Sequence, residues 1–142
     1  MLARLAYVSY ANTVMTDSEI KKILEKSQAN NKKAKVSGVL IYSDRFFFQC
    51  LEGEREEINQ TYLRIANDTR HSKCVVIAYS QIHSRLFPAW SMAYVSFNGL
   101  GNDLVFKYSE KGLFKPYEYT AGQAMEFLGE VSDLSTMSET TA

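Results

Sequence analysis

The sequence VSGVLIYSDRFFFQCLE, residues 36–52, contains two apolar segments separated by the polar triplet SDR. Short segments of β-branched and aromatic residues on either side of a turn predict strands, so we expect an antiparallel hairpin here. Side chains alternate between the two faces of a strand. In the second strand, one face carries Phe47, Gln49 and Leu51, and the other carries Phe46, Phe48 and Cys50. Both faces are largely apolar, which predicts a sheet that is covered on both sides.

The segments around the hairpin complete a familiar order of elements. The capping box TDSE (16–19) predicts the start of a helix that ends near residue 31, and apolar residues at helical spacing predict a second helix over 54–68. Strands are expected at 4–9, 36–42, 46–52, 73–80 and 90–96. The order is βαββαβ followed by a fifth strand. With both helices on one face, this predicts an α+β fold of the ferredoxin-like type.

The C-terminal part of the chain is expected to cover the second face of the sheet. Residues 102–111 and 121–134 predict helices, separated by GLFKPYEY. The last residues, STMSETTA, are polar and are expected to be frayed. We therefore divide the chain into a core (1–97), a helical extension packed on the sheet (98–134) and a tail (135–142).

Composition excludes several classes of function. The chain has 16 Lys+Arg and 16 Asp+Glu residues, so its formal net charge is zero and no basic stripe for nucleic acid is indicated. The sequence lacks an apolar segment of about 18 residues, which would predict a membrane span, and it lacks a signal-peptide pattern. We therefore expect a cytoplasmic protein. Cys50 and Cys74 lie in apolar strand segments and are expected to be buried thiols. His71 and His83 have no metal-ligand spacing around them, so no metal site is expected.

Gln49 is the residue that this pattern does not explain. A buried amide needs partners for its donors and acceptors, or each unpaired group costs about 1–3 kcal/mol. Tyr7 is a candidate partner because the first strand neighbours the third in this topology. Other polar candidates lie on the predicted helices: Ser27 and Asn31 share a face of the first helix, Asn30 stands with Asn31 at its C-terminal end, and Arg64 and Asp68 are four residues apart on the second. Trp90 and Met92 are expected on one face of the fifth strand.

Each of these candidates alone has an ordinary structural explanation, such as core packing, a helix cap or a solvated ion pair. Together with the apolar Ile23, Leu24, Leu40 and Ile65, they describe a pocket with flat walls and a few amides. Such a pocket suits a planar heteroaromatic ligand whose edge alternates donors and acceptors.

These residues occur in stretches that resemble the BLUF domains, which are blue-light receptors that use flavin. The similar stretches follow one another in family order across residues 2–96. They are LAYVS with Tyr7, SQANN with Ser27, Asn30 and Asn31, SGVLIY, FFQCLEGE with Gln49, YLRIANDTRH with Arg64, Asp68 and His71, and WSM with Trp90 and Met92.

The resemblance implies a flavin between the helices at 17–31 and 54–68, with FAD as the usual cofactor. Asn31 and Gln49 would bond the ring, Asn30 or Arg64 would serve its pyrimidine edge, and Tyr7 would bond Gln49. The implied cofactor-binding residues are Ile23, Ser27, Asn30, Asn31, Leu40, Gln49, Arg64, Ile65, Asp68 and His71. The charges of Arg70, His71 and Lys73 suggest a place near the phosphates.

The resemblance also implies a photochemical mechanism. Excited flavin would take an electron and a proton from Tyr7 by way of Gln49, whose amide is left rotated or tautomerised after recombination. The changed hydrogen bond would shift the absorption to the red, and Trp90 or Met92 would relay the signal to the C-terminal helices. Since no effector domain is recognised in this chain, we expect output to a downstream signalling protein and a homo-oligomer.

The residues leave three functions open. The leading one is a non-enzymatic photoreceptor. A flavin-dependent oxidoreductase is the second, although no substrate-activating base is visible in the sequence. The third is a chromophore-free ferredoxin-like binding module or acylphosphatase-like hydrolase, in which the amides are satisfied core groups. An absorption spectrum separates the third function from the other two.

Overall fold

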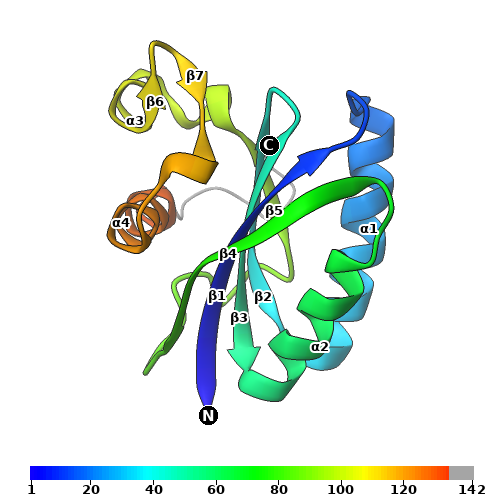
Figure 1. Ribbon diagram of the computed structural model, residues 1–142. Coiled ribbons are helices and arrows are strands. Elements are labelled where there is room, and N and C mark those ends of the chain that lie inside the picture. Colours follow the sequence, from blue (N-terminus) through cyan, green and yellow to red (C-terminus); the bar gives the residue numbers. More distant parts are fainter. Residues whose placement is uncertain (135–142) are drawn as a thin grey trace.

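A computed structural model describes residues 1–134 of the chain and shows a five-stranded sheet between two layers of helices (Figure 1). The strand order is β4-β1-β3-β2-β5, with β2 and β5 parallel and the other neighbours antiparallel. The strands are β1 (Leu2–Ala11), β2 (Ser37–Ser43), β3 (Phe46–Glu54), β4 (His71–Gln81) and β5 (Ala93–Ser96). The expected tail, 135–142, lies outside the described residues.

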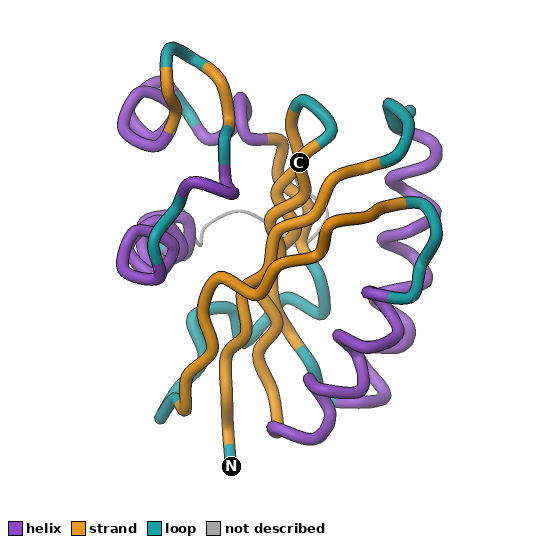
Figure 2. Tube along the Cα trace, in the orientation of Figure 1, coloured by secondary structure: helices purple, strands orange, loops and turns teal. Residues whose placement is uncertain are grey.

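The helices cover the two faces as the sequence predicts (Figure 2). One layer consists of α1 (Asp17–Ala34) and α2 (Arg55–Ala66), and the other contains α3 (Asn102–Tyr108) and α4 (Ala121–Ser132). Short 3-10 helices occur at Phe97–Leu100 and Pro116–Glu118. The predicted α+β, ferredoxin-like fold with a fifth strand is confirmed. The capping box at the start of α1 is also present, with Thr16 and Glu19 bonding each other's backbone N–H groups.

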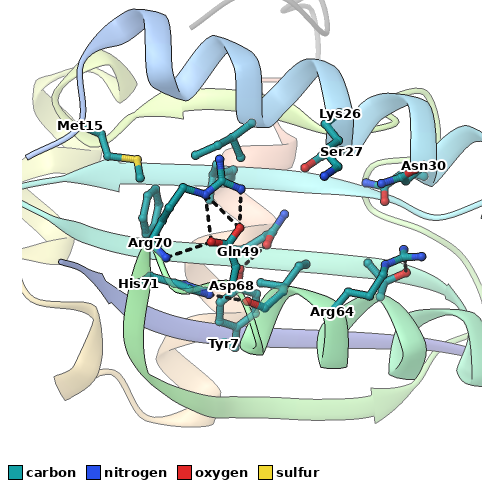
Figure 3. A pocket seen from close by; sticks show the side chains of 16 residues that line it. Tyr7, Met15, Lys26, Ser27, Asn30, Gln49, Arg64, Asp68, Arg70 and His71 are labelled. Atoms are coloured by element: carbon teal, nitrogen blue, oxygen red, sulfur yellow. Dashed lines mark hydrogen bonds and ion pairs between the residues drawn. The ribbon is translucent and has the colours of Figure 1, made fainter. Parts of the chain in front are cut away.

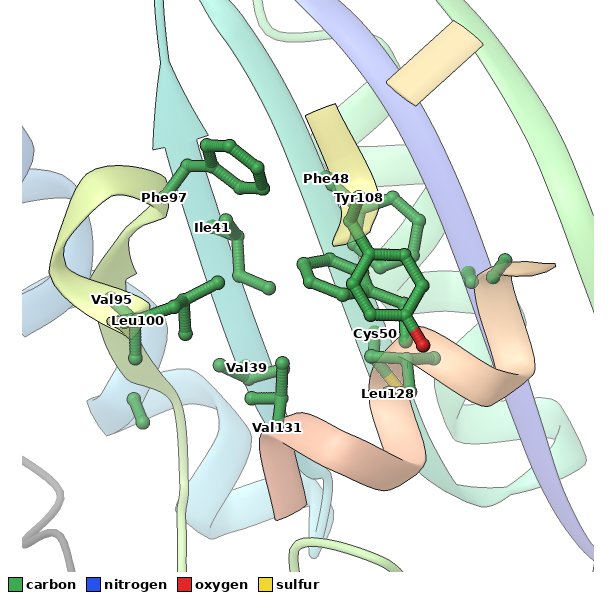
Figure 4. Packing of buried hydrophobic residues seen from close by; sticks show 14 of the residues in the cluster. Val39, Ile41, Phe48, Cys50, Val95, Phe97, Leu100, Tyr108, Leu128 and Val131 are labelled. Atoms are coloured by element: carbon green, nitrogen blue, oxygen red, sulfur yellow. The ribbon is translucent and has the colours of Figure 1, made fainter. Parts of the chain in front are cut away.

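The sheet separates two hydrophobic clusters, as the alternation in β3 requires. Phe48 and Cys50 lie in the cluster beneath α4, while Phe47 and Leu51 lie in the cluster beneath α1 and α2. Figure 4 shows Phe48, Tyr108 and Leu128 packed together over β3. Phe48 also contacts Phe127 edge-to-face, with ring centroids 5.5 Å apart. Apolar burial on both faces therefore ties the C-terminal helices to the sheet.

One glycine allows the central strands to pack. A Cβ atom built on Gly38 of β2 would lie 1.8 Å from the carbonyl oxygen of Cys50 on β3. No side chain fits there without moving one of the strands, so the residue type is set by close backbone approach.

The fifth strand is shorter than predicted. It begins at Ala93 rather than residue 90, because the backbone of the preceding segment bonds elsewhere. The N–H of Gly38 donates to the Trp90 carbonyl, at 2.9 Å. The side chains of Gln28 and Asn31 donate to the Met92 and Ser91 carbonyls, at 2.9 and 2.6 Å. These long-range bonds hold residues 90–92 outside the regular ladder.

Other boundaries also differ from the prediction. The helix expected over 102–111 ends at Tyr108, and the following residues form a small hairpin of β6 (Ser109–Glu110) and β7 (Leu113–Phe114). Lys111 and Gly112 turn this hairpin with positive φ values of 52° and 81°, which a helix cannot accommodate. Cys74 is half-buried rather than buried, because β4 is an edge strand. Within residues 1–134, no helix combines the length and apolarity needed to cross a membrane.

Phe127 is 0% exposed, so a Phe127→Ala variant should have a free energy of unfolding about 3–5 kcal/mol lower than the wild type. The matched control is Phe106→Ala on α3, because Phe106 is 88% exposed and truncating it should change stability by about 0.5 kcal/mol or less. Urea unfolding measures both. Equal losses in the two variants would show that α4 does not share the core of the sheet.

Candidate functional site

A cavity opens between α1 and α2 above the centre of the sheet (Figure 3). Its lining includes all of the residues that the resemblance assigns to cofactor binding: Ile23, Ser27, Asn30, Asn31, Leu40, Gln49, Arg64, Ile65, Asp68 and His71. Tyr7 and Arg70 line it too. The sequence analysis did not identify four further lining residues, which are Met15, Lys26, Phe47 and Thr61. Phe47 could have been found, because it shares the face of Gln49 in β3.

Gln49 lies at the base of this cavity with Tyr7 beside it. The two residues face each other in the register of β1 and β3, and Leu40 of β2 flanks Gln49 on the other side. The Tyr7 hydroxyl donates a hydrogen bond to Gln49 Oε1. On the other end of the amide, Nε2 lies 3.2 Å from the Met92 sulfur. Tyr7 is 2% exposed and Gln49 is 5% exposed, so the amide is buried with both ends engaged.

Burial raises the pKa of the Tyr7 phenol well above its ordinary value, and the neighbouring Cys74, Tyr62 and Asp68 raise it further. Desolvation has this effect because it disfavours the phenolate. The ring of Tyr62 meets that of Tyr7 edge-to-face at 5.3 Å. Tyr7 therefore keeps its proton at neutral pH and remains a hydrogen-bond donor to Gln49.

The polar residues of α1 either face the cavity or bond the segment that precedes β5. Ser27, Asn30 and Lys26 face the cavity in Figure 3. Asn31 is buried, and its Nδ2 donates to the Ser91 carbonyl while the residue still lines the cavity. One side of the cavity is thus joined directly to the segment that carries Met92.

Arg64 and Asp68 do not form the helical ion pair that their spacing allowed. The α2 helix ends at Ala66, so Asp68 lies beyond it and pairs with Arg70 through several charge-assisted bonds (Figure 3). Arg64 instead approaches the Thr61 hydroxyl, at 3.5 Å. The guanidinium of Arg70 bonds the Asp68 carboxylate and lowers its pKa to about 2.

His71 is held in a defined orientation. Its Nε2 bonds the Ile65 carbonyl, which only accepts, so this nitrogen carries a proton. Its Nδ1 lies 2.7 Å from the Ser9 hydroxyl, and the Cys74 sulfur is 3.8 Å from Nε2. Lys73, which was considered for the same role as Arg70 and His71, is not among the residues that line the cavity.

Trp90 and Met92 do not share a face, which corrects the sequence prediction. Met92 belongs to the cluster beneath α1 and α2, where it meets Gln49. Trp90 belongs to the opposite cluster and stacks on Phe87, with ring centroids 5.5 Å apart. The alternation rule fails because both residues precede β5 and follow an irregular path.

The lining fits a flavin. Ile23, Leu40 and Ile65 supply apolar surface for a planar ring, and the buried amides of Asn31 and Gln49 offer donors and acceptors for its edge. Lys26, Arg64 and Arg70 add cations that suit phosphate groups.

Comparison with known proteins agrees with this geometry. The family described as BLUF, sensors of blue-light using FAD, matches residues 2–93. The chain belongs to the BLUF family. This BLUF chain is similar to the solved structure of BlsA in its photo-activated state, with 30% identity, a TM-score of 0.85, and coverage of 100% of this chain and 99% of BlsA. The solved structure of BlrB shares the fold, with 24% identity and a TM-score of 0.80. The match covers 96% of this chain and 97% of BlrB.

Curated relatives are much longer proteins. The photoactivated adenylate cyclase subunit alpha of Euglena gracilis is 40% identical over 62 residues, or 44% of this chain and 6% of that protein. The subunit beta from Euglena longa is 30% identical over 92 residues, or 64% of this chain and 11% of that protein. The BLUF chain therefore spans only a small part of the curated relatives that it matches.

The Asp68–Arg70 pair should be visible in a titration. Because Arg70 stabilises the charged carboxylate, Asp68 should remain ionised at about pH 3, where an ordinary Asp with a pKa of about 3.9 is mostly protonated. The stabilisation is present above the ordinary pKa and is lost as the pH falls through about 2. Carboxyl chemical shifts in NMR spectra measure this. In Arg70→Met the pKa should return toward its ordinary value, and an equal pKa in both proteins would contradict the pairing.

Proposed function

We propose that this BLUF chain is a blue-light photoreceptor that holds FAD non-covalently between α1 and α2. The observation that supports this most is the buried hydrogen bond from Tyr7 to Gln49 at the base of the cavity. A paired phenol and amide, both desolvated and both next to a flat apolar space, match what a photochemical switch requires. Family membership supports flavin, and FAD is the form that the family description names.

Different residues around the cavity would contact the ring edge, the ring faces and the phosphates of the flavin. The amides of Asn31 and Gln49 would bond the edge of the ring, with Asn30 or Arg64 beside them. Ile23, Leu40 and Ile65 would pack against its faces. Ser27, Asp68 and His71 would complete the polar boundary, and Arg70 with Lys26 would face the phosphates.

Bound flavin would absorb blue light and supply an oxidant in its excited state. Tyr7 would give up an electron, and its hydroxyl proton would move along the existing hydrogen bond to Gln49. Both return to Tyr7 when the charges recombine, so no net oxidation remains. Gln49 would be left rotated or tautomerised, because its head group holds both donor and acceptor atoms.

Rotation of the amide would change what Gln49 presents on each side. In the structure, Oε1 accepts from Tyr7 and Nε2 faces the Met92 sulfur, and we assign this arrangement to the dark state. After a reversal, Nε2 would face Tyr7 and an oxygen would lie near the Met92 sulfur, which cannot donate to it. The contact that holds Met92 would therefore weaken, and the hydrogen bonds at the flavin edge would differ, giving a red-shifted state.

We further propose that the signal passes through residues 90–92 to the helices that follow residue 98, and from there to a downstream signalling protein. Trp90 supports this route, because it lies in the cluster that also contains α4 residues. A cytoplasmic location is proposed from the chain's free thiols, Cys50 and Cys74. The expected homo-oligomer stays a prediction. We propose no enzymatic activity, since the cyclase relatives match this chain over only a small part of their length.

Purified protein should be yellow, and blue light should shift its flavin absorption reversibly to the red. Tyr7→Phe and Gln49→Leu should retain flavin and lose this shift completely, because the first lacks the proton and the second cannot relay it. Tyr10→Phe is the matched control, since Tyr10 is on the same strand but packs on Phe46 away from the cavity. Spectra before and after illumination measure all of them.

Three outcomes would contradict the proposal. A colourless preparation that takes up no added FAD would remove the chromophore. A normal photocycle in either Tyr7→Phe or Gln49→Leu would remove the mechanism. Rapid flavin reduction on mixing with NAD(P)H would favour an oxidoreductase instead.

A further inference from the structure

We propose that Glu52 is a positioning residue for the photochemical switch, because its buried carboxylate holds the segment that presents Met92 to Gln49. This inference rests on the proposed function. Glu52 is on the same strand as Gln49 but faces the opposite side of the sheet from the cavity, and it contacts neither Tyr7 nor Gln49 through its carboxylate.

The carboxylate of Glu52 is 0% exposed and fully engaged. Its Oε2 accepts from Arg4 Nε at 2.8 Å and from the Leu86 N–H at 2.9 Å, and its Oε1 accepts from the Phe87 N–H at 2.8 Å. A carboxylate suits this place because it only accepts and can take several donors at once. A neutral amide would turn a donor toward one of these N–H groups.

Arg85 forms a second set of bonds next to Leu86 and Phe87. The Arg85 guanidinium donates to the Ser37 hydroxyl at 2.8 Å, the Glu52 carbonyl at 3.2 Å and the Lys35 carbonyl at 2.7 Å. Residues 85–87 are thus bonded by side chains and backbone to the ends of β2 and β3.

The remainder of the segment leads from this anchor to the switch. Phe87 stacks on Trp90, and the Trp90 carbonyl accepts from the Gly38 N–H. The next two carbonyls accept from Asn31 and Gln28 of α1, and the Met92 sulfur then meets Gln49 Nε2. The segment between Phe87 and Met92 is therefore held at both ends.

Stability alone does not account for a buried ion pair at this place. A well-packed apolar pair of similar size is often as stable as a buried ion pair, whereas removing one partner is costly. What Arg4 and Glu52 add is a directed attachment for two specific backbone amides. That attachment resists displacement of Met92 when Gln49 changes, and so it biases the balance between the dark and the light-adapted arrangement.

The test uses the flavin-loaded protein and compares Glu52→Gln with Arg4→Met. Both variants break the ion pair, but only Glu52→Gln replaces the acceptor of the Leu86 and Phe87 amides. We expect Glu52→Gln to change the dark-recovery rate by about fivefold or more, the low end of couplings between sites. Arg4→Met should change it by about twofold or less at a similar loss of stability, since the carboxylate keeps both amides.

Two further measurements give a readout that does not need the photocycle. Trp90 is the only tryptophan in the sequence, so its emission reports on the segment directly. Hydrogen exchange of the Leu86 and Phe87 amides should be faster in Glu52→Gln than in Arg4→Met. Glu54→Gln is the control for loss of a β3 carboxylate, because Glu54 is exposed and pairs with the N-terminal amine. If Glu52→Gln does not fold, Glu52→Asp takes its place in the test. It keeps the negative charge, but its shorter side chain moves the carboxylate away from the Leu86 and Phe87 amides.

The outcomes separate this proposal from the one on which it rests. A wild-type protein without a red shift contradicts the proposed function. A wild-type protein with the shift, but with the same recovery rate in Glu52→Gln and Arg4→Met, contradicts the positioning role and leaves the photoreceptor intact. Changed recovery together with faster exchange at Leu86 and Phe87 in Glu52→Gln alone supports it.

Discussion

The need to pair a buried amide governs the arrangement of this protein. Gln49 is in the middle strand of the sheet, where water cannot satisfy it, and an unpaired donor or acceptor there would cost about 1–3 kcal/mol. The register of β1 and β3 brings the Tyr7 hydroxyl to Oε1, and the irregular segment before β5 brings the Met92 sulfur to Nε2. The strand order, the cavity and the path of residues 90–92 all meet at this one side chain. The same amide can also exchange its donor and acceptor sides by rotating. The need for buried partners and the proposed switch therefore both come from the amide having a donor and an acceptor.

The sheet separates the proposed photochemical site from the C-terminal helices, which we propose carry the output. Tyr7, Gln49 and Met92 face α1 and α2, whereas Trp90 and Phe48 face α4. Residues 90–92 connect the two faces, because the side chains of Trp90 and Met92, two residues apart, enter opposite clusters. Glu52 and Arg85 tie the preceding residues 85–87 to the ends of β2 and β3, and Gln28 and Asn31 bond the Met92 and Ser91 carbonyls. The proposed hydrogen-bond change at Gln49 would therefore act on a segment that is bonded to α1 and β2.

Much of the candidate site followed from short-range rules. Alternation in residues 46–52 placed Gln49 on a covered face, and a spacing of four placed Ser27 and Asn31 on one side of a helix. The C-terminal helices were expected on the far face because both faces of the strands are apolar. Those rules failed for Asp68 and for Trp90 with Met92. Asp68 leaves the helix and meets Arg70, while residues 90–92 bond to α1 and β2 instead of extending β5.

The sequence by itself determined the order of elements, the two-faced sheet and the isolated polar residue in its centre, because periodicity is a local property of the chain. Only the tertiary structure decided which groups meet that residue and which side of the sheet Trp90 and Met92 enter. It also revealed the buried contacts of Glu52, which its place near the end of a strand does not indicate. Its partners are Arg4, near the N-terminus, and two amides more than thirty residues further along the chain. Contacts over such separations depend on how the strands pack, and no local pattern encodes them.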